Sequence, residues 1–147
     1  MNILGYDYPD DLAYCLERDL WCRAEADGSY MLGVTAFGVH ISGDFFMCRP
    51  KPVGTVLERG QSMAVVELNK SIVTVRTPLS GVVCRINPLL AERPEAIQHD
   101  PYGEGWILCL QPSAWSQERH ELVWADQLPV EAERRIQREP HDDEVVR

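Results

Sequence analysis

Lys70 is the residue whose type and surroundings point most directly to chemistry. It belongs to the dipeptide Asn69-Lys70, which lies between two stretches rich in β-branched and apolar residues, 64–68 and 71–75. Such flanks are typical of strands, so we predict a two-residue hairpin turn with the Lys70 amine at its tip. Asn69 tolerates positive φ and suits the first central position of a primed turn. An amine at the tip of a stiff hairpin can carry a covalently attached swinging arm, although most lysines in such turns are solvated surface residues.

The other side chains capable of chemistry are dispersed along the sequence. The cysteines never form a Cys-x-x-Cys pair, and the histidines do not supply zinc ligands at short spacing. We therefore predict free thiols, several of them inside strands as small apolar residues, while a redox role for one of them stays open. The sequence offers neither a Ser/His/Asp nor a Cys/His arrangement, so the chain is not expected to be an enzyme. These residues are Cys15, Cys22, Cys48, Cys84 and Cys109, and His40, His99, His120 and His141.

Composition limits the partners. A chain of 147 residues, 45% of them hydrophobic, is long enough for one domain with its own core. The net charge is −9 and the basic residues are spread out, which argues against nucleic acid and against an anionic membrane surface. The sequence contains no apolar run of the ~20 residues that a membrane helix needs. The first residues lack a secretory signal pattern, so we expect a cytoplasmic protein.

The central part of the chain is predicted to be mainly β with short helices. Turn signals separate many short strands, a pattern typical of a β-sandwich or a flattened barrel. Thr35 is predicted to cap a short helix that ends near Gly43, and Asn87-Pro88 to begin another. The predicted strands are residues 21–25, 30–34, 45–48, 62–68, 71–76, 81–86 and 106–110.

The two ends of the chain are predicted to add helices to this domain, residues 21–111. In the N-terminal segment, residues 1–20, an acidic start at Pro9-Asp10-Asp11 precedes a helical pattern of apolar residues. The C-terminal extension, 112–138, is expected to be helical and to be anchored by tryptophan and leucine side chains. Residues 139–147 are dominated by charge and are predicted to be disordered.

Several short motifs occur at defined intervals around Lys70. Gly33-Val34-Thr35 is followed ten residues later by Gly43-Asp44, eleven residues after that by Gly54, and thirteen further on by Glu67, three before Lys70. The chain continues with Pro78-Leu79-Ser80-Gly81, Asn87, Pro94 and Asp100-Pro101-Tyr102-Gly103-Glu104-Gly105-Trp106. This series, from Trp21 to Leu110, resembles the H-protein of the glycine cleavage system and its lipoyl-carrier relatives.

The resemblance implies a lipoyl/biotinyl-type flattened β-barrel sandwich, the hybrid fold, with helical additions at both ends. It also implies that a lipoate-attaching enzyme links lipoate to the Lys70 amine. Glu67 would then serve either recognition by that enzyme or the solubility of the strand surface. Gly103 and Gly105 are expected to serve backbone conformation through positive φ, and Trp106 is expected to be a core residue.

The chain departs from the family pattern around the arm and at both ends. It reads Glu67-Leu68-Asn69-Lys70 where the family usually has Glu-Ser-Val-Lys, and Asp19-Leu20-Trp21 where His-Glu-Trp is usual. Thr35-Ala36 replaces a common Thr-Asp, and the region past Pro112 is longer and more charged. Partner enzymes would dock at these surfaces, so the departures affect the pathway and not the attachment.

Four functions remain open from the sequence. The first is a carrier that resembles the lipoate-binding proteins of sulfur oxidisers and passes sulfur intermediates to a heterodisulfide-reductase-like complex. The second is a glycine cleavage H-protein, which carries an aminomethyl group and works with glycine decarboxylase, aminomethyltransferase and dihydrolipoyl dehydrogenase. The third is a biotin carrier, disfavoured because Asn69 and Ser71 flank Lys70 where biotinyl sites have methionines. The fourth is an unmodified interaction domain.

Overall fold

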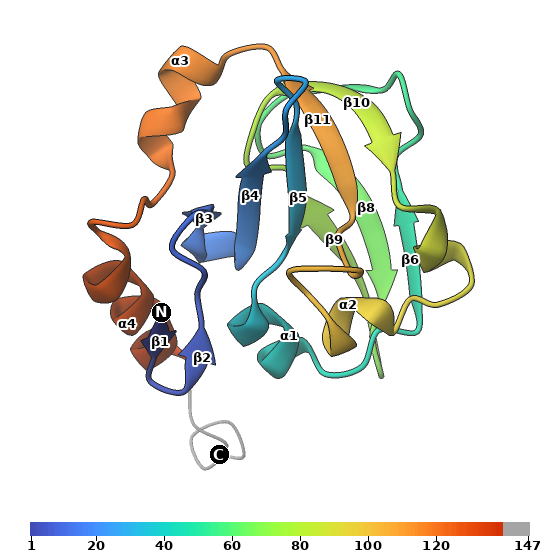
Figure 1. Cartoon of the computed structure of the whole chain (residues 1–147). Coiled ribbons are helices and arrows are strands. Elements are labelled where there is room, and N and C mark those ends of the chain that lie inside the picture. Colours follow the sequence, from blue (N-terminus) through green and yellow to red (C-terminus); the bar gives the residue numbers. More distant parts are fainter. Residues whose placement is uncertain (140–147) are drawn as a thin grey trace.

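A computed structural model describes residues 1–139 and has the mainly β architecture with short helices that the sequence predicts (Figure 1). The strands are β1 (Asn2–Ile3), β2 (Tyr6–Asp7), β3 (Ala13–Cys15), β4 (Leu20–Ala24), β5 (Tyr30–Val34), β6 (Met47–Pro50), β7 (Val56–Leu57), β8 (Ser62–Glu67), β9 (Ile72–Arg76), β10 (Gly81–Ile86) and β11 (Leu108–Pro112). The helices are α1 (Ala36–Ser42), α2 (Ala96–His99), α3 (Trp115–Glu118) and α4 (Leu128–Arg138), with 3₁₀ helices η1 (Leu16–Arg18), η2 (Pro88–Ala91) and η3 (Arg119–Glu121). Each predicted strand lies within two residues of an observed one, while β1, β2, β3 and β7 were not predicted.

Two antiparallel sheets enclose the main core. Six strands pair in the order β3-β4-β5-β11-β10-β7, and three in the order β6-β8-β9. Because side chains alternate between the two faces of a strand, every second residue of β4, β5 and β11 points toward the smaller sheet. Leu20, Leu32 and Leu108 lie on that face and are almost fully buried, together with Met63 and Val66 from β8. The fold is therefore the sandwich that the lipoyl-type prediction requires.

The opposite face of the six-stranded sheet is also covered. Trp21, Met31 and Cys109 point to this side and form a second buried cluster with residues of the N-terminal segment, α1 and α4. Leu128 and Ala132 of α4 are completely buried there. Figure 1 shows α4 beside β1 and β2, near the N-terminus. The C-terminal extension is thus helical, as predicted, and α4 completes this second buried cluster.

The prediction of a helix in the N-terminal segment is wrong. Residues around Tyr14 form the edge strand β3, which pairs with β4 through Tyr14 and Trp21, and η1 follows at once. On its other side Tyr14 exchanges backbone hydrogen bonds with Val123. All residues from 12 to 16 are buried, so the apolar pattern is that of a strand covered on both faces and not of a helix with one buried face.

Two further expectations concern the chain ends and membranes. The predicted disorder of 139–147 lies outside the described residues, apart from Glu139. Within residues 1–139, no helix is long and apolar enough to cross a bilayer.

Candidate functional site

The hairpin between β8 and β9 places Lys70 at its tip. The last paired residues are Glu67 and Ile72, and the Leu68 N–H donates to the Ser71 carbonyl over 2.8 Å, which leaves Asn69 and Lys70 as the central residues of the turn. Lys70 is exposed. The predicted hairpin is confirmed, but its primed geometry is wrong, because neither central residue has positive φ. Asn69 tolerates the left-handed region without requiring it.

Only two lysines occur in the whole sequence, Lys51 and Lys70. Lys51 directly follows β6, is half-buried, and its backbone N–H donates to the Met63 carbonyl over 2.8 Å. It therefore sits on the body of the small sheet, whereas Lys70 projects from the end of a ribbon. Of the two lysines, Lys70 is therefore the more exposed.

The outer face of the hairpin is partly apolar. Met47, Glu67 and Ile72 occupy one row across β6, β8 and β9. The Glu67 side chain is exposed, and Ile72 is 70% exposed. Phe46, whose N–H donates to the Glu67 carbonyl, is 54% exposed. The predicted alternatives for Glu67, enzyme recognition and strand solubility, both fit this exposed position.

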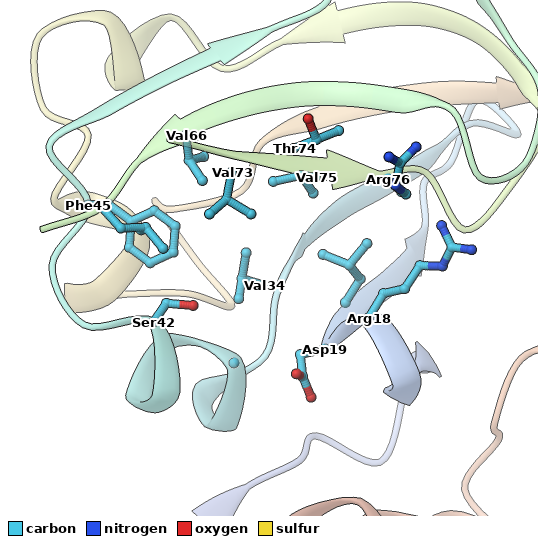
Figure 2. Close-up of a pocket in the computed structure, with 13 residues that line it drawn as sticks. Arg18, Asp19, Val34, Ser42, Phe45, Val66, Val73, Thr74, Val75 and Arg76 are labelled. Carbon is cyan, nitrogen blue, oxygen red and sulfur yellow. The ribbon is translucent and has the colours of Figure 1, made fainter. Parts of the chain in front are cut away.

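A cleft of about 220 Å³ lies along the inner side of β9. Figure 2 shows Phe45, Val66 and Val73 around one end and Arg18 and Arg76 at the other. The lining residues come from η1, β4, β5, α1, β8, β9 and the segments between them: Arg18, Asp19, Leu20, Val34, Gly38, Ser42, Phe45, Val66, Leu68, Val73, Thr74, Val75 and Arg76. The end lined by Leu68, two residues from Lys70, is apolar, so the cleft can receive an aliphatic group near Lys70.

The far end of the cleft carries two guanidinium groups that meet at Gly60. The Arg76 Nη1 donates to the Gly60 carbonyl over 3.1 Å. A Cβ at Gly60 would lie 3.7 Å from the Arg18 Nη2, so the Arg18 guanidinium is in contact distance of the same residue. The Arg18 Nη1 is buried and has no hydrogen-bond partner among the described residues.

Asp19, the one acidic residue that lines the cleft, is bound elsewhere. Its Oδ2 accepts from the Arg135 Nη2 over 2.7 Å, and both side chains are largely buried, at 10% and 12% exposure. The Arg135 guanidinium also lies 5.1 Å from the centre of the Phe37 ring. Burial raises the pKa of the Asp19 carboxyl above its usual range, and the hydrogen bond and charge of Arg135 act in the opposite direction. Arg18, Arg76 and Arg135 were not predicted as site residues, and the one sequence signal near them is the departure Asp19-Leu20-Trp21, next to Arg18.

Helix α1 forms one wall of the cleft through Gly38 and Ser42. As predicted, Thr35 caps this helix: its side-chain oxygen accepts from the Gly38 N–H over 3.0 Å, and the helix ends at Gly43. The Thr35 side chain that forms this cap is completely buried. A local sequence signal thus fixes the start of a helix that shapes the cleft.

The Asp100–Trp106 turn has a structural role. The Asp100 side chain binds nearby backbone, accepting from the Glu104 N–H over 2.9 Å. The prediction of positive φ at Gly103 and Gly105 is wrong. Glycine is needed there for space, since a Cβ at Gly103 would collide with the Asp100 carboxylate and one at Gly105 with the Ala96 carbonyl. Trp106 is half-buried and packs against the second buried cluster, in partial agreement with the prediction, and the Arg85 guanidinium lies 5.5 Å from its ring centre.

All five cysteines are free thiols, as predicted, and each lies in a strand. Cys15, Cys22, Cys48 and Cys109 are buried, and Cys84 is half-buried. Burial raises the pKa of the Cys48 thiol to about 12, so this thiol is not activated. Within residues 1–139, no group of three or more His, Cys, Asp or Glu side chains could hold a metal ion.

The chain is similar in sequence and in structure to glycine cleavage H-proteins. A family model described as glycine cleavage H-protein matches residues 12–134. The glycine cleavage system H protein of Halorhodospira halophila is 40% identical over 109 residues, 74% of this chain and 83% of that protein. H protein 2 of Aquifex aeolicus is 33% identical over 135 residues, 92% of this chain and 84% of that protein.

The structural comparison agrees with the sequence comparisons. The crystal structure of a glycine cleavage system H protein from Mycobacterium marinum superposes with a TM-score of 0.72 at 28% identity, covering 85% of this chain and 98% of that one. Together with the family match over most of the chain, these similarities determine the assignment. This chain belongs to the glycine cleavage H-protein family of non-catalytic carriers, which hold lipoate covalently on a lysine.

Proposed function

We propose that Lys70 is the lipoylated lysine and that its arm shuttles a reaction intermediate between partner enzymes. The observation that carries this proposal is the contrast between the two lysines of the chain: Lys70 is exposed at a hairpin tip, and Lys51 is half-buried beside β6. The family binds lipoate on a lysine, and the surroundings of Lys70 fit the group. The amine is accessible to a lipoate-attaching enzyme, and an apolar cleft begins near Leu68.

The chain's own contribution is placement and shelter. When bound, a lipoyl group supplies a dithiolane that can be opened by reduction and closed by oxidation. The paired strands β8 and β9 hold the Lys70 backbone away from the sheet, so several enzymes can reach the arm in turn. The apolar walls around Phe45 and Val66 offer the arm a place that excludes water. As a location we propose the cytoplasm, where a reducing environment suits five free thiols.

For the pathway, the relatives support the glycine cleavage system as the first candidate. The partners would then be glycine decarboxylase, aminomethyltransferase and dihydrolipoyl dehydrogenase, besides the lipoate-attaching enzyme. The support lies in the description that the relatives from Halorhodospira halophila and Aquifex aeolicus share. We further propose residues 21–111 as the lipoyl domain, with the N-terminal segment 1–20 and the extension 112–138 as additions to it.

A second candidate is a carrier of sulfur intermediates that works with a heterodisulfide-reductase-like complex. The observation in its favour is the lining of the cleft. Leu20 stands where the family usually has a glutamate. Among the charged residues that line the cleft, Asp19 is paired with Arg135, whereas Arg18 and Arg76 have no buried carboxylate to neutralise them. Such a lining is poorly suited to a cationic aminomethyl group.

Intact mass spectrometry tests the attachment. The chain is produced with a lipoate-attaching enzyme and free lipoate, alongside the variants Lys70→Arg and Lys51→Arg. We expect a lipoyl-sized mass increment in the natural chain and in Lys51→Arg, and none in Lys70→Arg. An increment that persists in Lys70→Arg, or that disappears only in Lys51→Arg, would overturn the proposal.

Loading by partner enzymes separates the two pathways. Lipoylated protein is incubated with glycine, pyridoxal-phosphate-loaded glycine decarboxylase and labelled carbonate, and exchange of label into glycine is measured against a glycine cleavage H-protein. Exchange at a comparable rate would support the glycine cleavage candidate. Exchange near background, with the lipoyl increment confirmed by mass, would favour the second candidate.

A further inference from the structure

We infer that the arginine end of the cleft, formed by Arg18 and Arg76, binds an anionic group, and that this end selects the chemical class of what the arm carries. The inference about the arm rests on the proposed lipoylation of Lys70. The binding property belongs to the cleft itself and can be measured without any arm. Arg18 and Arg76 come from elements far apart in sequence, η1 and β9, and only the fold brings them together.

The strongest observation is the unsatisfied Arg18 Nη1. The Arg18 side chain lines the cleft, and its Nη1 atom is buried and has no hydrogen-bond partner among the described residues. A buried polar group without a partner is costly, and a charged donor is more costly than a neutral one. No group in residues 1–139 satisfies this donor, so an acceptor from outside the chain that reaches it would remove the cost. A carboxylate or another oxyanion is the acceptor that guanidinium binds best.

Arg76 makes the site specific for negative charge. Its side chain binds the Gly60 carbonyl at 3.1 Å, and the Arg18 guanidinium lies against the same glycine. Figure 2 shows both side chains at the same end of the cleft. Two guanidinium groups held in one place repel each other and attract an anion between them. A neutral acceptor would satisfy the hydrogen bonds but not offset the repulsion.

The nearby carboxylate does not compete for this position. Arg18, Asp19 and Arg76 are the ionisable side chains that line the cleft. The Asp19 Oδ2 is engaged with Arg135 of α4 over 2.7 Å, and this pair is largely buried. The Asp19 side chain points away from Arg76 (Figure 2). The cleft therefore keeps an excess of positive charge because α4 neutralises its single carboxylate.

The dimensions agree with an arm that starts at Lys70. Arg76, at the end of β9, follows Lys70 by six residues, which corresponds to roughly 20 Å of extended chain. An extended lysine side chain joined to an eight-carbon acid spans a distance of the same order, and the long Arg18 and Arg76 side chains reduce the gap. The apolar section between Phe45 and Thr74 would hold the aliphatic part, and the arginines the anionic end.

The cleft is tested first with free probes on the unlipoylated full-length chain. Hexanoate, hexylamine and hexanamide are titrated separately, and amide resonances of Gly38 and Thr74 are followed by NMR. We expect saturable shifts with hexanoate that weaken at high salt, and at least about tenfold weaker binding of the amine and the amide.

Two variants and a control assign the effect to the arginines. Arg18→Gln and Arg76→Gln should each weaken hexanoate binding about tenfold or more. Arg76 is exposed, so its variant keeps the test available if Arg18→Gln unfolds. Arg49→Gln removes an exposed arginine outside the cleft and should leave binding unchanged. Equal binding of hexanoate and hexylamine, or loss of binding only in Arg49→Gln, would overturn the inference.

The second experiment tests the arm. Reduced lipoylated protein in a Cys84→Ser background is alkylated with iodoacetate, iodoacetamide or bromoethylamine, which leave anionic, neutral or cationic ends, and intact mass confirms each product. In this background, the anionic arm should shift the Gly38 and Thr74 resonances when Arg76 is present and not in Arg76→Gln. The same shifts from the cationic arm would overturn the inference. A lipoyl increment absent at the mass step would overturn the proposed function alone, because the free-probe result still decides the cleft.

Discussion

Replacing Arg135 by glutamine should destabilise the fold by about 3–5 kcal/mol. The Asp19 and Arg135 side chains are only 10% and 12% exposed, and their hydrogen bond is 2.7 Å long. Asp19 also has its Oδ1 buried without a partner, so Arg135 is the group that compensates its charge. Removal of one member of a buried pair leaves an uncompensated charge, which costs more than the pair itself contributes. Loss of the contact with Phe37 adds to the effect.

The loss should depend on pH. Burial raises the folded-state pKa of Asp19, and Arg135 lowers it. An acid with a raised folded pKa contributes stability that is fully present below its unfolded pKa and is lost as pH rises through the folded pKa. In Arg135→Gln the folded pKa of Asp19 rises further, so this variant should be close to the natural protein near pH 4 and should show its full deficit near pH 8.

Urea unfolding of the natural chain and the variants at both pH values measures this. Arg134→Gln is the matched control, since Arg134 is 69% exposed in its pair with Glu131 and its loss should cost under about 1 kcal/mol. Asp19→Asn in the Arg135→Gln background should recover much of the stability at pH 8, and asparagine tolerates the φ of 57° found at Asp19. A deficit for Arg135→Gln no larger than that of Arg134→Gln, or one independent of pH, would refute the reasoning.

Three further outcomes are expected. At pH 8 a thiol reagent should label Cys84 in the folded chain while the four buried cysteines stay unlabelled until urea is added, and rapid labelling of several thiols before unfolding would contradict the burial. Thr35→Ala should cost about 1 kcal/mol in urea unfolding by removing the cap of α1, and Thr35→Ser should recover most of it. Gly105→Ala should lower stability by about 1–3 kcal/mol because its Cβ would meet the Ala96 carbonyl, and an unchanged unfolding midpoint would show that the turn can shift.

Strand positions could be predicted because alternation and turn residues are local signals. The strands 30–34 and 81–86 agree with β5 and β10 at both ends. The cap at Thr35 could also be predicted, since its side chain binds a backbone N–H only three residues away. The prediction of an N-terminal helix was wrong because the structure of this segment depends on distant residues. Tyr14 is a strand residue because Trp21 and Val123 pair with it, and the local pattern does not contain those partners.

The features of the candidate site likewise fall into those that the sequence determines and those that depend on the tertiary structure. The sequence by itself determined the family, the hairpin and the amine at its tip, because Lys70 and its flanking strands are contiguous. Only the tertiary structure decided the chemistry of the cleft. Arg18 and Arg76 meet at Gly60, and Arg135 of the C-terminal helix neutralises Asp19. Charges act through space and desolvation depends on burial, so residues far apart in the chain together set the charge of the cleft.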